Sequence, residues 1–122
     1  CLSGDIDHLS PSQWAKVDEG IAFFKAVRHI IGDGISAFHG DVSEAWRSPE
    51  GWQAVCRTRG SETLSVIHTF DGAHPAEVRL PVEGKRILRV MCSENNAVRL
   101  EDGTLVVELK APFEAVAVHT GD

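Results

Sequence analysis

The spacing of apolar residues changes at Gly34, and this change limits the possible folds of the chain more than any other feature. Before Gly34, apolar side chains recur every three or four residues, as they do on one face of an α-helix. After Gly34, apolar and polar residues alternate over short segments, as they do in half-buried β-strands. We therefore expect one long helix followed by a region built of strands.

Several signals agree on where the helix begins. Ser10 is a preferred N-cap residue, and Pro11 follows at the first helical position, where its missing N–H costs nothing. Gln13 lies three residues after Ser10 and completes a capping box. Leu9 and Trp14 have the spacing of a hydrophobic staple. The sequence therefore predicts a helix that starts at Pro11.

The apolar stripe of this helix is long and needs a partner surface, which the rest of the chain either supplies or leaves bare. Gly20 weakens the helix by about 1 kcal/mol relative to Ala and indicates a close approach to a neighbouring element. We expect the helix to end at Gly32, as a left-handed residue, and at Gly34. The predicted stripe consists of Trp14, Val17, Ile21, Phe24, Val27 or Arg28, and Ile31, widened by Phe23 and Ile30.

The alternating segments after Gly34 are short, rich in β-branched residues and bounded by turn residues. Asp102-Gly103 lies between two of them and predicts a tight hairpin, and Pro81 predicts an edge strand or a bulge. No strand–helix alternation is present. We expect a mainly β fold, an antiparallel β-sandwich or open barrel of six to eight strands, with an irregular connection over residues 39–51. The segments cover residues 52–58, 63–69, 76–82, 86–92, 104–110 and 114–119.

Composition narrows the class of protein. The chain has 122 residues and a net charge of -6, with no basic cluster, which argues against a nucleic-acid or anionic-membrane surface. Its apolar runs are too short for a transmembrane segment. Cys1, Cys56 and Cys92 are odd in number and match no zinc spacing, which favours free thiols in a reducing compartment. We therefore expect a cytoplasmic protein.

No metal or cofactor site is evident from spacing. The six histidines are scattered, and none belongs to a metal-binding pattern. His68 and His119 fall in strand segments and are expected to face a sheet surface or the core. The sequence also has no Gly-rich phosphate loop and no nucleophile elbow. We therefore expect no metal and no cofactor.

Two groups of residues could contact a sugar. Asp5, just before the helix, is either a ligand of a sugar or metal or a loop carboxylate favoured by the helix dipole. The connection after residue 39 concentrates carboxylates beside Trp46 and Trp52. Carboxylates next to tryptophans can stack on and hydrogen-bond a sugar, or these tryptophans simply pack the connection over the sheet edge.

The chain resembles alpha-galactosidases of the melibiase type. The most specific part is "LSGDIDHLSPSQWAKVDEGIAFFKAVRHIIGDG", residues 2–34, which is similar to the end of the catalytic barrel in that family. The segments "WRSPEGWQAVCR", "SVIHTF" and "LVVELKAPFEAVAVH" are similar to the C-terminal β-sandwich that follows. The resemblance extends from Leu2 to about His119.

This resemblance implies a division of the chain. Residues 1–34 correspond to the last loop and helix of a (β/α)8 barrel, and residues 35–122 to a C-terminal antiparallel sandwich. Ser3, Gly4 and Asp5 match the turn beside the substrate pocket, on the face where barrel active sites lie. The family's two catalytic carboxylates, which perform a retaining double displacement, lie on earlier barrel strands. The resemblance therefore implies no catalytic residue in this chain, which alone is expected to be inactive.

Three hypotheses follow. In the first, the chain is the C-terminal part of an alpha-galactosidase-like glycoside hydrolase and supports the catalytic barrel of the same parent protein, with galactoside sugars as ligands. In the second, it is a free-standing carbohydrate-binding module with Trp46 and Trp52 as a stacking platform. In the third, it is a structural interaction domain. Because the helix stripe needs a cover, we also expect the isolated chain to self-associate.

Overall fold

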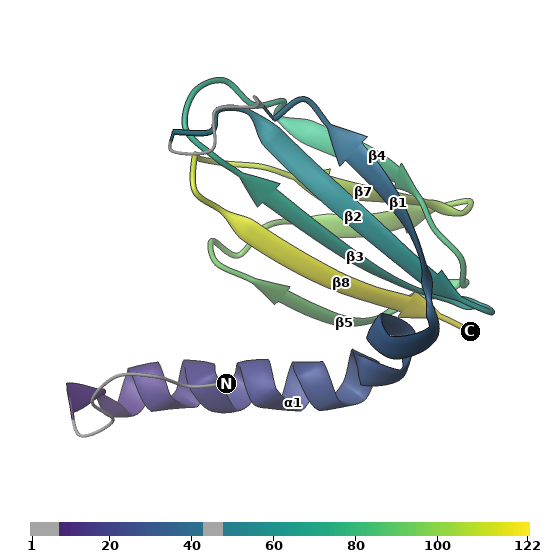
Figure 1. Cartoon of the computed structure of the whole chain (residues 1–122), viewed down its shortest axis with the longest axis horizontal. Coiled ribbons are helices and arrows are strands. Elements are labelled where there is room, and N and C mark those ends of the chain that lie inside the picture. Colours follow the sequence, from purple (N-terminus) through teal and green to yellow (C-terminus); the bar gives the residue numbers. More distant parts are fainter. Residues whose placement is uncertain (1–7, 43–47) are drawn as a thin grey trace.

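A computed structural model of the chain describes residues 8–42 and 48–122. The described residues form one helix and eight strands, in the order seen in Figure 1. The elements are α1 (Pro11–Asp33), β1 (Ile35–Gly40), β2 (Trp52–Arg59), β3 (Glu62–Thr69), β4 (Glu77–Pro81), β5 (Arg86–Cys92), β6 (Val98–Glu101), β7 (Thr104–Glu108) and β8 (Ala115–Gly121).

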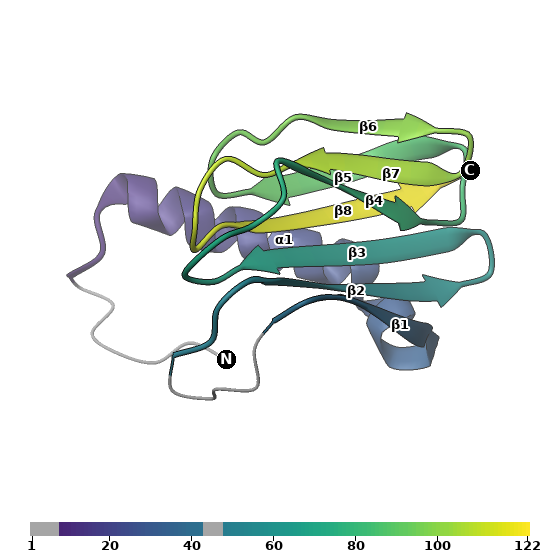
Figure 2. The same cartoon turned by 90° about the horizontal axis from the view of Figure 1, so that it is seen from above.

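The strands form two antiparallel sheets that face each other. The large sheet has the order β1-β2-β3-β8-β5, and the small sheet has the order β4-β7-β6. In Figure 2, β1 and β2 lie on the side of β4 away from β7 and β6, so they extend past the edge of the small sheet. The predicted mainly β, antiparallel sandwich preceded by one long helix is therefore confirmed.

The main core fills the space between the two sheets. Strand alternation directs one face of each sheet inward, and the inward side chains are aliphatic or small. Ile67, Leu105, Val116 and Val118 are completely buried there. The buried members of this core are Ala54, Cys56, Ile67, Val78, Leu80, Leu105, Val107, Leu109, Val116 and Val118.

Helix α1 packs on the outer face of the large sheet, opposite the small sheet. Val27 and Ile30 are buried against Leu64 of β3, and Phe23 packs beside them. Arg57 of β2 extends this contact, since its Nε donates to the carbonyl oxygen of Ile31 at 2.7 Å. Figure 1 shows the C-terminal end of α1 closest to the strands. The contact extends into the N-terminal half of the helix, where Gly20 lies beside Met91 of β5. The helix therefore packs on β2, β3 and β5.

The predicted helix start and the predicted end at Gly34 are confirmed, but the left-handed conformation expected of Gly32 is wrong. The Ser10 side chain accepts from the backbone N–H of Gln13, and the Gln13 side chain accepts from the backbone N–H of Ser10. The helix runs through Gly32 and ends at Asp33, with Gly34 in an extended conformation (φ -82°). A Cβ on Gly34 would lie 2.6 Å from Arg57 Cγ, so this glycine is required by close packing rather than by a left-handed turn.

The helix buries only one edge of the predicted apolar stripe. The buried row contains Phe23, Val27 and Ile30, whereas Ile21, Phe24 and Ile31, which were also predicted to belong to the stripe, are exposed. The two rows are offset by one position, a rotation of about 100° around the helix axis. Both rows are apolar, so periodicity alone could not decide which of them faces the sheet.

All six predicted strand segments are confirmed as β2, β3, β4, β5, β7 and β8. Asp102 and Gly103 both have positive φ and join β6 to β7, as the hairpin prediction required. Pro81 is the last residue of the edge strand β4. Strand β1 was not predicted, and β6 was implied only by the Asp102-Gly103 hairpin, without bounds. Strand β1 lies mainly before the expected irregular connection and overlaps it only at residues 39 and 40.

Candidate functional site

Of the residues predicted to contact substrate, the structure describes Trp52 alone. Ser3, Gly4, Asp5 and Trp46 lie outside the described residues. Trp52 is the first residue of β2, is half-buried, and packs partly against the main core. It also lines an open cleft, which we call the Trp52 cleft.

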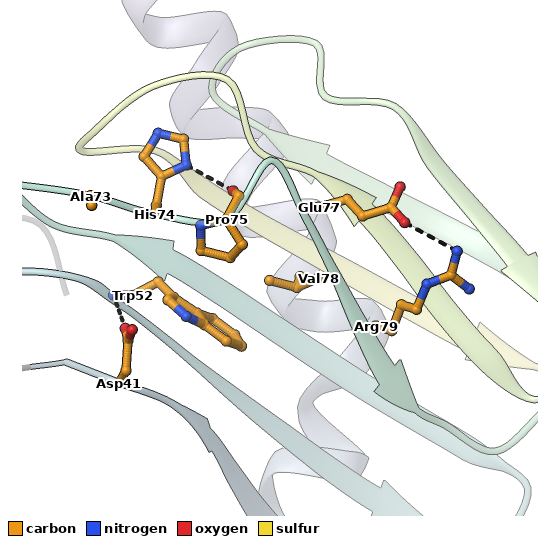
Figure 3. Close-up of a pocket in the computed structure, with 8 residues that line it drawn as sticks. All are labelled: Asp41, Trp52, Ala73, His74, Pro75, Glu77, Val78 and Arg79. Atoms are coloured by element: carbon orange, nitrogen blue, oxygen red, sulfur yellow. Dashed lines mark hydrogen bonds and ion pairs between the residues drawn. The ribbon is translucent and has the colours of Figure 1, made fainter.

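The Trp52 cleft lies where the edge of β4 and the loop before it face the start of β2. Its volume is about 630 Å³. Figure 3 shows the indole of Trp52 between Asp41 on one side and Glu77 with Arg79 on the other. Its lining residues are Asp41, Trp52, Ala73, His74, Pro75, Glu77, Val78 and Arg79.

Backbone pairing between the start of β2 and the residue after β1 fixes Asp41 beside Trp52. The Asp41 N–H donates to the Trp52 carbonyl oxygen at 3.0 Å, and Asp41 Oδ1 accepts from the Trp52 N–H at 3.3 Å. Gly51 permits this approach, because it has φ +100° and an added Cβ would lie 2.8 Å from Asp41 Oδ1. The carboxylate is thus held at the mouth of the cleft with acceptor capacity to spare.

Arg79 belongs to a closed ring of four charged residues on the outer face of the small sheet. Arg79 pairs with Glu77 at 3.0 Å and with Glu101 at 3.1 Å. Arg99 pairs with Glu101 at 2.6 Å and with Glu77 at 3.5 Å. The ring covers Val106 of β7, which is paired with both arginines and is completely buried.

The ring favours the charged forms of Arg79 and Glu101. Hydrogen bonds to Glu101 and then to Glu77 raise the pKa of Arg79, and hydrogen bonds from Arg99 and then Arg79 lower the pKa of Glu101. The ring therefore positions Arg79 as a hydrogen-bond donor at the cleft.

His74 gives the cleft an acceptor. Its Nδ1 lies 2.9 Å from the carbonyl oxygen of Pro75. A carbonyl oxygen only accepts, so Nδ1 carries the proton in this bond, and neutral His74 presents Nε2 as an acceptor. The Trp52 cleft thus combines an aromatic face, a carboxylate, a guanidinium and an imidazole.

A second polar cluster joins α1 to the large sheet. Glu62 of β3 accepts from His29 of α1 and from His119 of β8, each at 2.9 Å. Arg89 of β5 lies 3.0 Å from His119 Nδ1. Because arginine only donates, Nδ1 of His119 is the acceptor and Nε2 carries the proton given to Glu62. The hydrogen bond from His29, followed by that from His119, lowers the pKa of Glu62 despite its partial burial.

This cluster was not predicted from the sequence, because its members are far apart along the chain and match no motif. His119 was expected at a sheet surface or in the core, and it is 2% exposed beneath α1. Both imidazoles point their Nε2 atoms at one carboxylate. In the described parts of the chain, no group of three or more His, Cys, Asp and Glu residues is placed to hold a metal ion.

The part of the predicted stripe that does not face the sheet is an uncovered apolar row on α1. Ile21 is 41% exposed, Phe24 is 54% exposed and Ile31 is 41% exposed. Ile35 and Phe38 of the adjoining edge strand β1 are exposed as well. We call Ile21, Phe24 and Ile31 the outer stripe.

Within residues 8–42 and 48–122, no helix has the length and apolar character needed to cross a membrane. Cys56 and Cys92 are free, and burial raises the pKa of the Cys56 thiol. The chain matches no known protein family, no curated protein and no solved structure.

Proposed function

We propose that this chain is the C-terminal part of an alpha-galactosidase-like glycoside hydrolase, in which the sandwich supports the catalytic barrel through α1. The observation that carries the proposal is the uncovered outer stripe of Ile21, Phe24 and Ile31. The resemblance of residues 2–34 to the last helix of such a barrel supports the catalytic barrel as the partner of this stripe.

The packing of α1 supports a helix that contacts both the sandwich and a second domain. A helix that is apolar on two faces is typical of a buried position rather than of a surface. One face is covered by the large sheet through Val27 and Ile30. The outer stripe is rotated from that face and is free to contact the strands and helices of a barrel. The helix would then lie between barrel and sandwich.

The polar residues of the sandwich support a catalytic site in the barrel rather than in this chain. A glycosidase needs two carboxyl groups, one of which shifts between acid and base. In the Trp52 cleft, Glu77 is held by Arg79 and Arg99, and Asp41 accepts from a backbone N–H. We therefore assign the chain a supporting role.

The proposal is tested by the complete gene product. The source gene should encode, upstream of Cys1, a series of strand–helix repeats with two aspartates at strand ends. The complete product should hydrolyse p-nitrophenyl α-D-galactopyranoside, and residues 1–122 alone should not. A gene that encodes no barrel upstream, or a complete product without glycosidase activity on this substrate, would contradict the proposal and leave a structural interaction domain as the better account.

A further inference from the structure

We propose that the Trp52 cleft is a saccharide-binding site, in which one face of a pyranose ring stacks on the indole of Trp52. In this site Asp41 and Arg79 form hydrogen bonds with the ring hydroxyl groups. The proposal does not rest on the proposed function, because it concerns the sandwich alone.

The shape of the cleft suits a small ligand. Its volume of about 630 Å³ falls within the range of about 300–1,000 Å³ that is usual for small-molecule sites. The floor is apolar, being formed by Trp52, Pro75 and Val78 (Figure 3). Because the indole also packs against the main core, its orientation is fixed before a ligand arrives. A preformed aromatic platform lowers the entropic cost of binding.

The polar groups around the platform match a polyhydroxylated ligand. Arg79 uses its two terminal nitrogens for Glu101 and Glu77, which leaves its Nε–H as a donor. Asp41 keeps acceptor capacity beyond its bond to the Trp52 backbone. Within the described residues, the indole N–H of Trp52 makes no hydrogen bond, so it is a further donor. A sugar hydroxyl both donates and accepts, and it can use donors and acceptors of this kind together.

Charge argues against an anionic ligand. The charge of Arg79 is shared with Glu77 and Glu101. No ion pair to Asp41 is present in the described parts of the chain, so this carboxylate would repel a phosphate or carboxylate ligand. A purely apolar ligand is also disfavoured, since it would leave the Nε–H of Arg79 and the remaining acceptor capacity of Asp41 unused in the cleft. A neutral saccharide meets both conditions.

The site and the outer stripe can be occupied at the same time. Helix α1 packs on the outer face of the large sheet, whereas Trp52 belongs to the inward side that carries the main core. Binding of a saccharide would therefore be independent of any domain that covers α1. Failure of one proposal leaves the other standing.

The test is a titration of residues 1–122 with methyl pyranosides, followed through the indole N–H signal of Trp52 by NMR. The probes are the methyl glycosides of galactose, glucose, mannose, xylose and N-acetylglucosamine, with inorganic phosphate as the anionic alternative. Concentrations up to about 100 mM detect dissociation constants weaker than 1 mM. The Trp52→Phe variant assigns the signal while keeping an aromatic ring against the core.

Arg79 and Arg99 form a matched pair for this test. Both bind Glu77 and Glu101, but Arg79 lines the cleft and Arg99 does not. Arg79→Ala should weaken saccharide binding about tenfold or more, since it removes a charged donor. Arg99→Ala should change binding less than about twofold, although it breaks the same ring. Asp41→Asn keeps the acceptor for the Trp52 backbone and should weaken binding by removing the charge.

Saturable shifts of the Trp52 signal with at least one pyranoside, lost in Arg79→Ala and kept in Arg99→Ala, are the expected result. The absence of a saturable shift with all five glycosides would overturn the proposal. So would equal effects of the two arginine variants, or a shift caused by phosphate alone.

Discussion

Glu62 of β3 accepts a hydrogen bond from His119 of β8 at 2.9 Å, and His119 is only 2% exposed. The other carboxylate oxygen of Glu62 accepts from His29 of α1 at the same distance. One carboxylate thus connects the helix to two strands of the large sheet. This arrangement makes the attachment of α1 depend on the charge of Glu62.

We expect the free energy of unfolding to fall at acidic pH, because Glu62 becomes protonated there. Hydrogen bonds from His29 and then His119 hold its pKa below the ordinary value of 4.5. A depressed folded-state pKa adds stability above the unfolded pKa, and this stability is lost as pH falls through the folded pKa. We expect Glu62→Gln to lower the free energy of unfolding at pH 7 and to reduce its dependence on pH below about 4.5.

Urea unfolding curves of both proteins between pH 7 and pH 3 check this expectation. Glu83→Gln is the control, because the side chain of Glu83 is exposed and forms no hydrogen bond or ion pair with a described residue. If Glu62→Gln and Glu83→Gln show the same pH dependence, Glu62 does not carry the effect.

Replacing His119 with alanine should lower the free energy of unfolding more than replacing His29 with alanine. His119→Ala leaves Arg89 and Glu62 without a buried partner, so we expect a loss of about 1–3 kcal/mol in the free energy of unfolding. His29 has a side chain that is 36% exposed, and His29→Ala should cost less than about 1 kcal/mol. Urea denaturation at pH 7 measures both values. A larger loss in His29→Ala would show that the helix end of the cluster dominates.

Gly20 should tolerate a side chain that Gly34 does not. A Cβ on Gly20 would lie 3.5 Å from Met91 Cε, which is an ordinary contact, so the predicted close approach to a neighbour leaves room for a methyl group. Gly20→Ala should raise the free energy of unfolding by about 0.5–1 kcal/mol through helix propensity. Gly34→Ala should lower the free energy of unfolding, because the added Cβ would lie 2.5 Å from the Ile30 carbonyl oxygen.

Thermal unfolding of the two alanine variants separates these effects. A loss of stability in Gly20→Ala would mean that α1 lies closer to β5 than the structure places it.

The isolated chain should self-associate through the outer stripe. Ile21, Phe24 and Ile31 present an apolar row on a long helix, and two such rows can cover each other. We expect concentration-dependent dimers in sedimentation velocity, reduced in Phe24→Glu. Ala22→Glu is the matched control, because it adds the same charge to an exposed position outside both apolar rows of α1. A strictly monomeric profile at high concentration would contradict this prediction.

Local features of the fold were predictable from the sequence. The capping box at Ser10 and the Asp102-Gly103 hairpin depend on neighbouring residues, and alternation marked β2, β3, β4, β5, β7 and β8. Strand β6 alternates over only four residues, which is too short to stand out, and β1 lies at an edge with exposed apolar side chains on both faces, so it shows no clear alternation. These two strands form because their partners pair with them.

The candidate site was predictable only in part. Trp52 was predicted because an aromatic residue stood near carboxylates in the sequence. Arg79 and Glu77 were missed, since they reach the cleft through the packing of one sheet on the other. The same reason applies to Glu62 and His119, which no local pattern connects. Contacts between distant strands depend on topology, which a single sequence does not specify.

The central claim is that the outer stripe of α1 is an interface with a further domain, and unfolding of Phe24→Glu in two settings tests it most directly. In residues 1–122 alone, at concentrations low enough to keep the chain monomeric, Phe24 is 54% exposed and the change should alter stability by less than about 0.5 kcal/mol. In the complete gene product, it should lower stability by at least about 2 kcal/mol, because a carboxylate would enter an apolar contact. Ala22→Glu should have little effect in either. Equal stability of Phe24→Glu and Ala22→Glu in the complete product would contradict the claim.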